Sequence, residues 1–457
     1  MRYLALCCDY DGTLATDGRV LPATVAAVER LIASGRRVVL VTGRELDDLR
    51  GVCPRLDLFQ YVVAENGALL YEPATRKEMP LAQRPPESFI AALRARGVGP
   101  ISVGRIVVAT WEPHEAAVLE TIKDQGLELQ VIFNKGAVMV LPAGVNKASG
   151  LSAALQRLGL STHNAVAIGD AENDHALLGL CECGVAVANA LPTLKEAASF
   201  VTTADHGAGV AELIGALLAD DLASHEPDLI RHHILLGWDR AEREVRIRPY
   251  GENVLVAGTP DGQKATLVGG LLERLAASGY TYCVVDAHGA YESSPGAVSL
   301  GAADRPASVD EILKLFRSPD QSGVINLAGL TPADRPRFVG ILIPQLAQQC
   351  AQIGLPHWLV VDGDFAWTVA KDTSAPAKLA NVLRIMARPS LVAPSVLASV
   401  NLLIAIGNTP QAMFEEFCRV TGAPAPHMDA VSLNPGEALA WRPQARGSAP
   451  FKLRIAQ

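Results

Sequence analysis

The sequence predicts an α/β protein of two consecutive domains, the first of which carries a small inserted α/β segment. Three observations predict this fold class. In both halves, short β-branched runs alternate with amphipathic helical stretches, which is typical of a parallel sheet with helices on both faces. An acidic helical stretch separates the halves, and 457 residues are enough for two or three domains with sizeable cores.

The first half contains four predicted strands and one clear helix. The strands lie at residues 3–8, 37–41, 61–63 and 165–168. Between the first two strands, Val25, Val28 and Leu31 recur at helical spacing, and Gly35 suits a helix C-cap. This segment therefore predicts a βαβ unit.

An insert interrupts the first half, and a second α/β series follows the linker. The insert opens on two prolines and then reads helix, strand, helix, strand, whereas the last segment of the chain is rich in Pro, Ala and Arg. The expected boundaries are residues 1–83 and 136–218 for the first domain, 84–135 for the insert, 219–230 for the linker, 231–422 for the second domain and 423–457 for a C-terminal tail, whose last twenty residues are expected to be loosely held. The strands expected in the second domain lie at residues 254–257, 282–285, 323–327, 358–361 and 402–406.

The composition excludes several classes of protein. With 49% hydrophobic and 19% charged residues, the chain is neither fibrous nor largely disordered. A net charge of −8 gives no global basic field for nucleic acid or an anionic membrane. No apolar stretch is long enough to span a membrane, and the N-terminus lacks a signal-peptide pattern, so we expect a cytoplasmic protein. Its eight scattered cysteines form no CxxC pair, which argues against a disulfide framework or a structural zinc site.

Two carboxylates follow the first predicted strand. Asp9 and Asp11, two residues apart where an extended segment leaves the sheet, point to the same side and can share one hard cation, and Gly12 allows a tight exit. The first carboxylate would remain free to attack an electrophile. The alternative is an ordinary acidic turn.

Three further motifs follow other strands or begin a helix. Thr42 and Gly43 offer a hydroxyl and loop amides suited to a phosphoryl oxygen, although Thr42 could simply be a helix N-cap. Lys147 begins a predicted helix, where a lone lysine is usually a solvated charge. The most specific motif places acidic residues directly after the strand at residues 165–168; its members are Asp170, Asn173 and Asp174. All four motifs would converge at one edge of the predicted sheet.

These motifs resemble the haloacid dehalogenase superfamily of magnesium-dependent phosphohydrolases, over residues 1 to about 215. The turns at residues 64–68 and 187–190 resemble it as well. The insert resembles the type II α/β cap of the Cof-like branch. Its short length is closer to archaeal-type phosphoglycolate phosphatases and to sucrose- and mannosylglycerate-phosphate phosphatases than to large-capped sugar phosphatases. The resemblance implies a Rossmann-like core under a small cap.

The resemblance also implies a role for each motif residue. Asp9 would be the nucleophile that forms an aspartyl-phosphate, and Asp11 the general acid and base. The phosphoryl group would be held by Thr42, Gly43, Lys147 and Asn173. Mg²⁺ would be held by Asp9, Asp11 (usually through its carbonyl), Asp170 and Asp174. Arg105, Trp111 and His114 of the insert are polar or aromatic, but packing or solvent contact is the interpretation that we favour for them.

A second site is indicated in the second half. Gly258 and Lys264 keep the spacing of a phosphate-binding P-loop, but Gln263 replaces the second glycine and Ala265 the metal-binding hydroxyl. Asp286 ends another apolar strand, and the order of these segments resembles HerA-like translocating ATPases. Because Gly363 stands where that family has a glutamate, we expect a degenerate P-loop NTPase-like domain. Lys264 could still hold a phosphate of ATP, and the alternative is a docking or oligomerisation module.

The sequence therefore predicts a Mg²⁺-dependent phosphatase, a phosphoric monoester hydrolase that acts on a small phosphorylated metabolite. The alternative is an ATP-binding or translocase-like P-loop protein with an ancillary phosphatase domain. Nucleic acid and membrane are not expected as partners, and a homo-oligomer remains open. The sequence does not identify the phosphoester.

Overall fold

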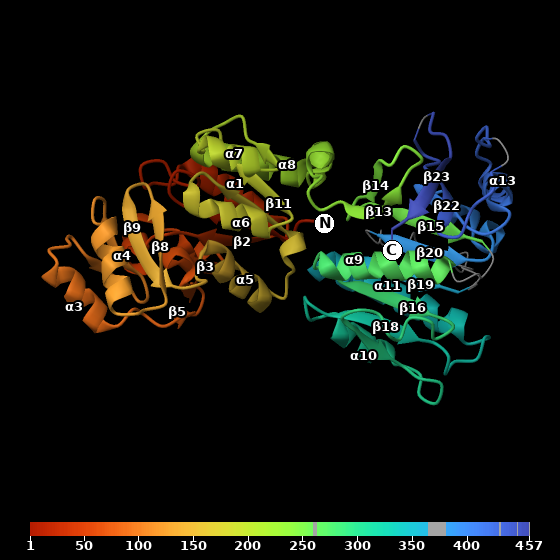
Figure 1. Ribbon diagram of the computed structural model, residues 1–457, viewed down its shortest axis with the longest axis horizontal. Helices are drawn as coiled ribbons and strands as arrows, with labels where there is room; N and C mark the ends of the chain where they lie inside the picture. Colours follow the sequence, from red (N-terminus) through yellow and green to blue (C-terminus); the bar gives the residue numbers. More distant parts are fainter. Residues whose placement is uncertain (259–262, 364–380, 429–430, 446, 457) are drawn as a thin grey trace. The chain divides into compact units, whose positions relative to one another are not determined.

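The chain forms two compact units, Met1–Ile230 and Arg231–Gln457 (Figure 1). The computed structural model describes residues 1–258, 263–363, 381–428, 431–445 and 447–456. The boundary between the units falls at the end of the segment expected to be a linker, residues 219–230.

The first unit is built on an eight-stranded sheet in the order β12-β11-β10-β1-β2-β3-β4-β5. The pairs from β12 to β3 are parallel, and β4 and β5 extend the sheet through antiparallel pairs. Its strands are β1 (Ala5–Asp9), β2 (Arg37–Val41), β3 (Tyr61–Ala64), β4 (Leu69–Glu72), β5 (Lys77–Pro80), β10 (Ala165–Gly169), β11 (Cys183–Ala186) and β12 (Phe200–Val201). Because β1 is central and wholly buried, its carboxyl end opens onto the middle of the sheet edge.

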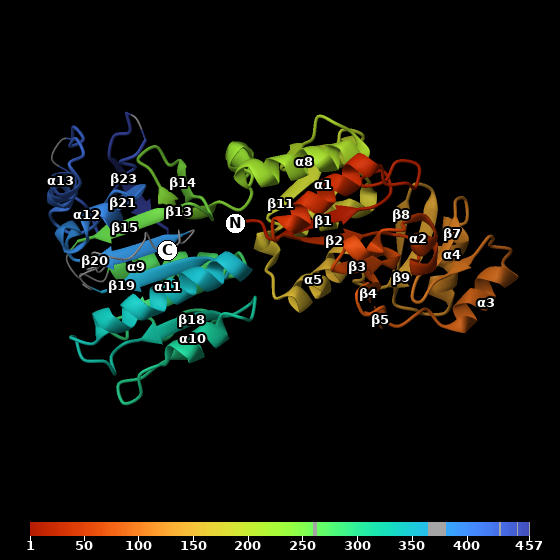
Figure 2. The ribbon, with the colours of Figure 1, turned by 180° about the vertical axis from the view of Figure 1, so that it is seen from behind.

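Helices cover both faces of this sheet (Figures 1 and 2). They are α1 (Pro22–Ala33), α2 (Leu46–Val52), α5 (Lys147–Leu158), α6 (His175–Leu180), α7 (Pro192–Ala197) and α8 (His206–Asp220). Helix α1 packs against α8, and α5 packs against α6 and on β2, β3 and β4. Helix α1 buries Val28 and Leu31, as the spacing in the sequence predicts, together with Ala27, whereas Val25 is only half-buried. Pro22 stands in its first turn, where no intrahelical N–H is lost.

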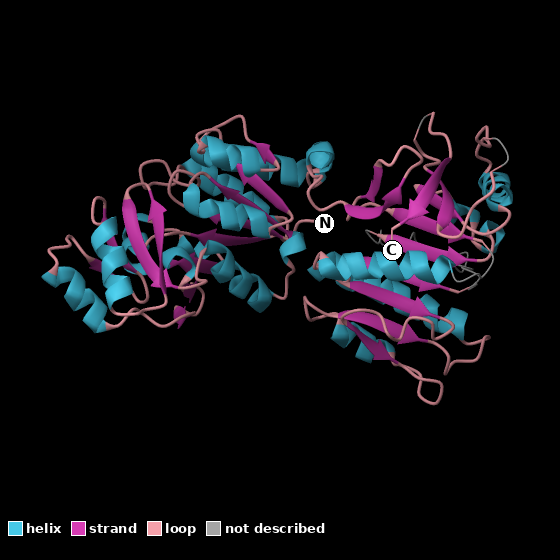
Figure 3. Cartoon of the chain, in the orientation of Figure 1, coloured by secondary structure: helices cyan, strands magenta, loops and turns pink. Residues whose placement is uncertain are grey.

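The insert folds as a separate four-stranded antiparallel sheet in the order β6-β7-β9-β8, with two helices (Figure 3). Its elements are α3 (Glu87–Ala95), β6 (Ser102–Val103), β7 (Val108–Trp111), α4 (Glu115–Asp124), β8 (Leu129–Asn134) and β9 (Ala137–Pro142). The insert therefore extends beyond residue 135, where we expected it to end. The reason is that β9 pairs with both β7 and β8 and buries Val138 and Val140 in the insert's own core.

A buried carboxylate joins the insert to the core. Glu65, only 1% exposed, accepts hydrogen bonds from the backbone N–H groups of Arg105, Ile106 and Val107 at 2.7–2.9 Å. Glu65 lies in a turn where it and Asn66 both have positive φ, 52° and 53°. The three amides satisfy a charge that would otherwise be buried alone, so this contact fixes the entry of the chain into β7.

The second unit contains an eleven-stranded sheet in the order β14-β13-β23-β22-β21-β15-β20-β19-β16-β18-β17, parallel from β21 to β17. Its strands are β13 (Ile234–Trp238), β14 (Glu244–Ile247), β15 (Asn253–Ala257), β16 (Tyr282–Asp286), β17 (Ala297–Leu300), β18 (Ser322–Asn326), β19 (Trp358–Asp362), β20 (Val382–Met386), β21 (Leu402–Ala405), β22 (Glu437–Trp441) and β23 (Phe451–Ile455). Its helices are α9 (Gln263–Ala277), α10 (Val309–Leu315), α11 (Arg335–Ile353), α12 (Pro394–Leu397) and α13 (Pro410–Thr421). The parallel α/β series expected here is present.

The C-terminal segment differs from the tail expected at residues 423–457, with its loosely held last twenty residues. Strands β22 and β23 form an antiparallel pair that joins β21 to β13 within the sheet. Leu453 is fully buried, and Ala438 and Ala440 face the same core. The segment is ordered because its two short strands pair with strands that lie far away in the sequence. Its Pro-rich composition gives no sign of this long-range pairing. In the part of the chain that the structure describes, no helix combines the length and apolar character needed to cross a membrane.

Candidate active site

The carboxyl ends of β1, β2 and β10 meet at one edge of the first sheet. Asp9 is the last residue of β1 and pairs in register with Val41 of β2, so that Thr42 follows directly beside it. Asp170 follows the last residue of β10, on the other side of β1. The topology thus brings together three of the four motifs.

Lys147 supplies the fourth motif. It is the first residue of α5, whose N-terminus is capped by Asn146 in a reciprocal capping box with Ser149. The Lys147 side chain is only 2% exposed, and its Nζ donates to Asp9 Oδ1 at 2.5 Å and to Asp174 Oδ1 at 2.7 Å. The lysine is therefore a buried bridge between two carboxylates and not a solvated charge.

Two glycines allow α5 to approach this closely. At Gly67, whose φ is +106°, a side-chain Cβ would lie 1.9 Å from the backbone oxygen of Asn146. At Gly150, one turn into the helix, a Cβ would lie 2.6 Å from the Cα of Gly67. Any larger residue at either position would push the first turn of α5, and Lys147 with it, away from β1.

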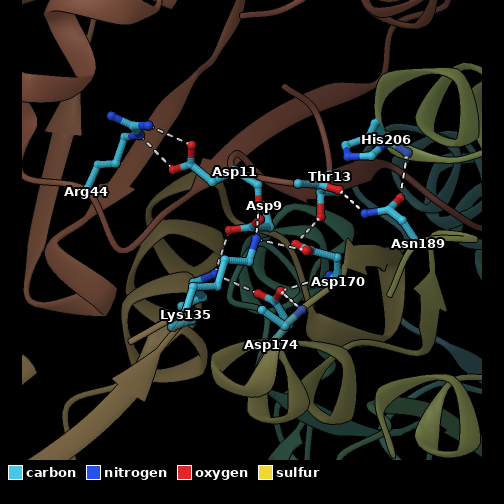
Figure 4. A network of polar contacts seen from close by, with 12 residues as sticks. Asp9, Asp11, Thr13, Arg44, Lys135, Asp170, Asp174, Asn189 and His206 are labelled. Atoms are coloured by element: carbon cyan, nitrogen blue, oxygen red, sulfur yellow. Dashed lines mark hydrogen bonds and ion pairs between the residues drawn. The ribbon is translucent and has the colours of Figure 1, made fainter. Parts of the chain in front are cut away.

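Asp174 and Asp170 are held in different ways (Figure 4). Asp174 is fully buried, and its Oδ2 accepts from the backbone N–H groups of Asp170 and Ala171 at 3.0 Å, while its other oxygen binds Lys147. Asp170 accepts from the hydroxyl of Thr13 at 3.0 Å and from Nζ of Lys135 at 2.9 Å. Asp174 therefore shapes the loop, whereas Asp170 faces other side chains.

Three of these acids could hold a metal ion. Asp9, Asp170 and Asp174 each offer a carboxylate oxygen within 4.8 Å of the others, and all three are buried. Oxygen ligands suit a hard divalent cation. An ammonium group, that of Lys135, already lies between Asp170 and the backbone oxygen of Asp11, which shows that this place attracts a cation. The donor set therefore fits Mg²⁺.

The charges at the site perturb one another. Burial, with the neighbouring Asp174 carboxylate, raises the pKa of Asp9 to about 8, although Lys147 opposes this rise. Burial alone would lower the pKa of Lys147, but the carboxylates of Asp174 and Asp9 outweigh it and raise that pKa above its ordinary value. The pocket thus holds more negative charge than one lysine balances.

Asp11 lies beside the cluster with its carboxylate turned toward Arg44. Arg44 donates from Nε at 2.6 Å and from Nη2 at 2.7 Å to the two oxygens of Asp11 (Figure 4). The hydrogen bonds to Asp11 raise the pKa of the Arg44 guanidinium. Sequence reasoning missed this contact, although Arg44 directly follows the predicted Thr42-Gly43 motif and could have been considered with it.

The polar groups near Gly43 are only partly satisfied. A Cβ at Gly43 would lie 3.4 Å from Nδ2 of Asn134 and 3.7 Å from Nδ2 of Asn173, so both amides flank this glycine. Asn173 Nδ2 donates to Asn66 Oδ1 at 2.9 Å. Yet one buried atom of each of the three asparagines has no hydrogen-bond partner among the described residues. Buried polar atoms left in this state are typical of a binding site for a polar ligand. Thr42 is buried, and its Oγ1 accepts from the N–H of Arg44.

The remaining insert residues considered from the sequence do not reach the cluster by any contact in the structure. Arg105 pairs with Asp47 and Glu78, and His114 Nε2 bonds to the backbone oxygen of Gly99. Trp111 is 54% exposed. Lys135, where we expected the insert to end, does reach the cluster through its contacts with Asp11 and Asp170. Lys135 and Gly136 form the turn after the last strand predicted in the insert, and this position was the signal that could have pointed to Lys135.

In the second unit, the carboxylate of Asp286 is hydrogen-bonded to backbone N–H groups of its own loop. Its carboxylate, at the end of β16, accepts from the N–H groups of His288, Gly289 and Tyr291, each at 2.9 Å. Lys264, in the first turn of α9, donates to the backbone oxygen of Met386 at 3.1 Å. Gly258 directly follows β15, and residues 259–262 and Asp364 lie outside the described residues. Asp286 therefore orders its own loop, and neither a P-loop fold nor nucleotide binding is shown.

Comparison with known proteins bears on the first unit. A family model described as haloacid dehalogenase-like hydrolase matches residues 6–105 and 100–214. A phosphoglycolate phosphatase of Methanothermobacter thermautotrophicus is 31% identical over 220 residues, which make up 46% of this chain and 96% of that protein. A phosphoglycolate phosphatase of Natronomonas pharaonis is 33% identical over 224 residues, which make up 46% of this chain and 95% of that protein. A solved haloacid dehalogenase-like hydrolase from Bacteroides thetaiotaomicron is 20% identical, with a TM-score of 0.42 over 47% of this chain and 99% of that one.

Proposed function

This chain belongs to the haloacid dehalogenase-like hydrolases and is a phosphoric monoester hydrolase, and from that premise we propose that it is a Mg²⁺-dependent phosphatase. Its substrate is a small phosphorylated metabolite of the phosphoglycolate or sugar phosphate type. The observation that carries the proposal is the buried contact of Lys147 with Asp9 and Asp174 at the carboxyl edge of the sheet. The names of the two archaeal relatives support the substrate class.

In the proposed mechanism, an oxygen of Asp9 attacks phosphorus and the bond to the leaving alkoxide breaks. The alkoxide takes a proton from Asp11, which requires one oxygen of Asp11 to leave Arg44. Asp11 then removes a proton from water, the water oxygen attacks phosphorus, and the Asp9–phosphorus bond breaks to release phosphate. Two displacements thus regenerate both carboxyl groups.

The other residues of the cluster bind and orient. Thr42, Gly43 and Asn173 hold the phosphoryl oxygens, and Lys147 keeps Asp9 aimed at them while balancing its charge. Asp170, Asp9 and the Asp11 carbonyl oxygen would hold Mg²⁺, with Asp174 completing or orienting this set of ligands. When bound, Mg²⁺ would polarise a phosphoryl oxygen and offset the repulsion between the anionic nucleophile and the anionic substrate.

The test is phosphate release from a panel of 2-phosphoglycolate, sugar phosphates and glycerol phosphates, with Mg²⁺ and with chelator. Borohydride added during turnover should reduce an acyl phosphate on Asp9 to homoserine, which peptide mapping detects. Turnover without label at residue 9, or label at another acid, would contradict the mechanism. Absence of turnover on the whole panel would contradict the function.

A further inference from the structure

The turn between β8 and β9 carries an unusual residue. Lys135 and Gly136 are its two central residues, with φ of 50° and 84°, as a tight two-residue hairpin requires. Asparagine or glycine is usual where φ is positive, and lysine there carries a conformational cost. A costly conformation that places a side chain at a reacting centre points to a functional reason for that side chain.

The hairpin places Lys135 inside the cluster described above. Nζ of Lys135 donates to the backbone oxygen of Asp11 at 2.8 Å and to Asp170 Oδ2 at 2.9 Å (Figure 4). Asp170 in turn has a carboxylate oxygen within 4.8 Å of one on Asp9, the proposed nucleophile. The hairpin therefore reaches the groups that surround the proposed nucleophile.

Three other cations of the insert pair with acids outside the cluster. Arg84 pairs with Glu87, Arg96 with two acids of α4, and Arg105 with Asp47 and Glu78. Lys135 differs from these three because its ammonium contacts the acidic cluster itself. Asn134, the residue before Lys135, places its side-chain amide beside Gly43. The oxygen of this amide has no hydrogen-bond partner among the described residues.

Lys135 can also leave its present place at low cost. Its side chain is 49% exposed, whereas that of Lys147 is 2% exposed. A divalent ion on Asp170 and the Asp11 carbonyl oxygen would take the place of the Lys135 ammonium, because two cations cannot share those oxygens. The displaced ammonium would stay near the site, because the hairpin holds the backbone of Lys135 there. It would then have lost its ion pair with Asp170.

We propose that Lys135 is a specificity-determining residue: when the divalent ion displaces it, its ammonium binds a second anionic group, such as a carboxylate, on the leaving part of the substrate. This inference rests on the proposed function and narrows its substrate class to phosphoesters with two anionic groups. The charge count supports it, since the ion and Lys147 balance the acidic cluster and leave Lys135 for the ligand.

The first test compares 2-phosphoglycolate with 2-hydroxyethyl phosphate, an ester of the same length without the carboxylate. The wild-type protein should prefer 2-phosphoglycolate, and Lys135→Met should lower that preference about tenfold, through KM more than kcat. Lys135→Arg should restore part of it. Lys123→Met, an exposed lysine of the same insert, is the matched control. An unchanged preference in Lys135→Met would overturn the proposal.

The second test needs no turnover. In an Asp9→Asn background with Mg²⁺, calorimetry measures the binding of both esters, so the preference is read even if the wild-type protein hydrolyses neither and the proposed function fails. In the absence of ester, Lys135→Met should bind Mn²⁺ several-fold more tightly than the wild type, because the competing ammonium is gone. Equal Mn²⁺ affinity would overturn the displacement, and equal loss for both esters would overturn the recognition of the anion.

Discussion

The two units place acidic residues at the same topological position and use them differently. In the first unit, Asp9 ends one parallel strand, Asp170 directly follows another, and both carboxylates meet lysine ammonium groups. In the second unit, Asp286 ends a parallel strand and meets three backbone N–H groups. A carboxylate that faces displaceable side chains can bind a ligand, whereas one that is saturated by its own loop stabilises the fold. An acid at the end of a strand therefore does not by itself define a site.

Asp9→Asn should have the largest effect on activity. It tests whether the acids that contact lysine side chains in the first unit form a catalytic site. Loss of the proposed nucleophile should lower phosphate release by about 1,000-fold or more, because an amide forms no covalent intermediate. Asp17→Asn is the matched control, since Asp17 is an exposed acid of the same loop with a φ of 50° that asparagine tolerates. If Asp9→Asn retained its activity, the acids of the first unit would not be catalytic, and they would no longer differ in function from Asp286 of the second unit.

Lys147→Met should lower the free energy of unfolding of the first unit by about 3–5 kcal/mol, because it leaves two carboxylates buried without their partner. Hydrogen exchange of first-unit peptides in urea measures this loss. The double variant Asp9→Asn with Lys147→Met should recover part of it, since one of the buried charges is then removed. No recovery would mean that lost packing, and not charge, causes the destabilisation.

Leu453→Ala should lower the free energy of unfolding of the second unit by about 2–4 kcal/mol, because it opens a cavity under β23. Exchange in urea of peptides from β13 and β22 reports it. Arg454→Ala, at an exposed position of the same strand, should cost less than about 1 kcal/mol. Equal effects of the two variants would indicate that β23 is not part of the sheet core.

Asp286→Asn and Glu65→Gln should have the smallest effects, about 1–3 kcal/mol each, and they sharpen the comparison. Each replaces one acceptor oxygen by an amide that cannot accept from the backbone N–H groups it faces. Faster hydrogen exchange should be confined to residues 288–291 in the first variant and 105–107 in the second. Unchanged exchange would show that these carboxylates do not hold their loops.

Much of this arrangement follows from local sequence signals. Strand periodicity and the rule that ligands meet the carboxyl ends of parallel strands predict that Asp9, Thr42 and Asp170 converge, and the helix-start signal at Lys147 agrees. Lys135 was not predicted. The turn after a predicted strand marks where it lies, but its contact depends on how the insert folds over the core, and no local pattern encodes that contact. The same limit applies to β22 and β23, whose pairing partners lie far away in sequence.

The contact between Gly67 and Gly150 also constrains how this protein can change over evolutionary time. Successive residues of an α-helix are rotated by about 100°, so one amino acid inserted between Lys147 and Gly150 would turn the ammonium to another side of α5 while the glycines stayed in contact. Loop 143–145, before the capping residue, can vary in length without this consequence. We therefore expect descendants of this gene to tolerate insertions and deletions in that loop but none within the three-residue step from the lysine to the glycine.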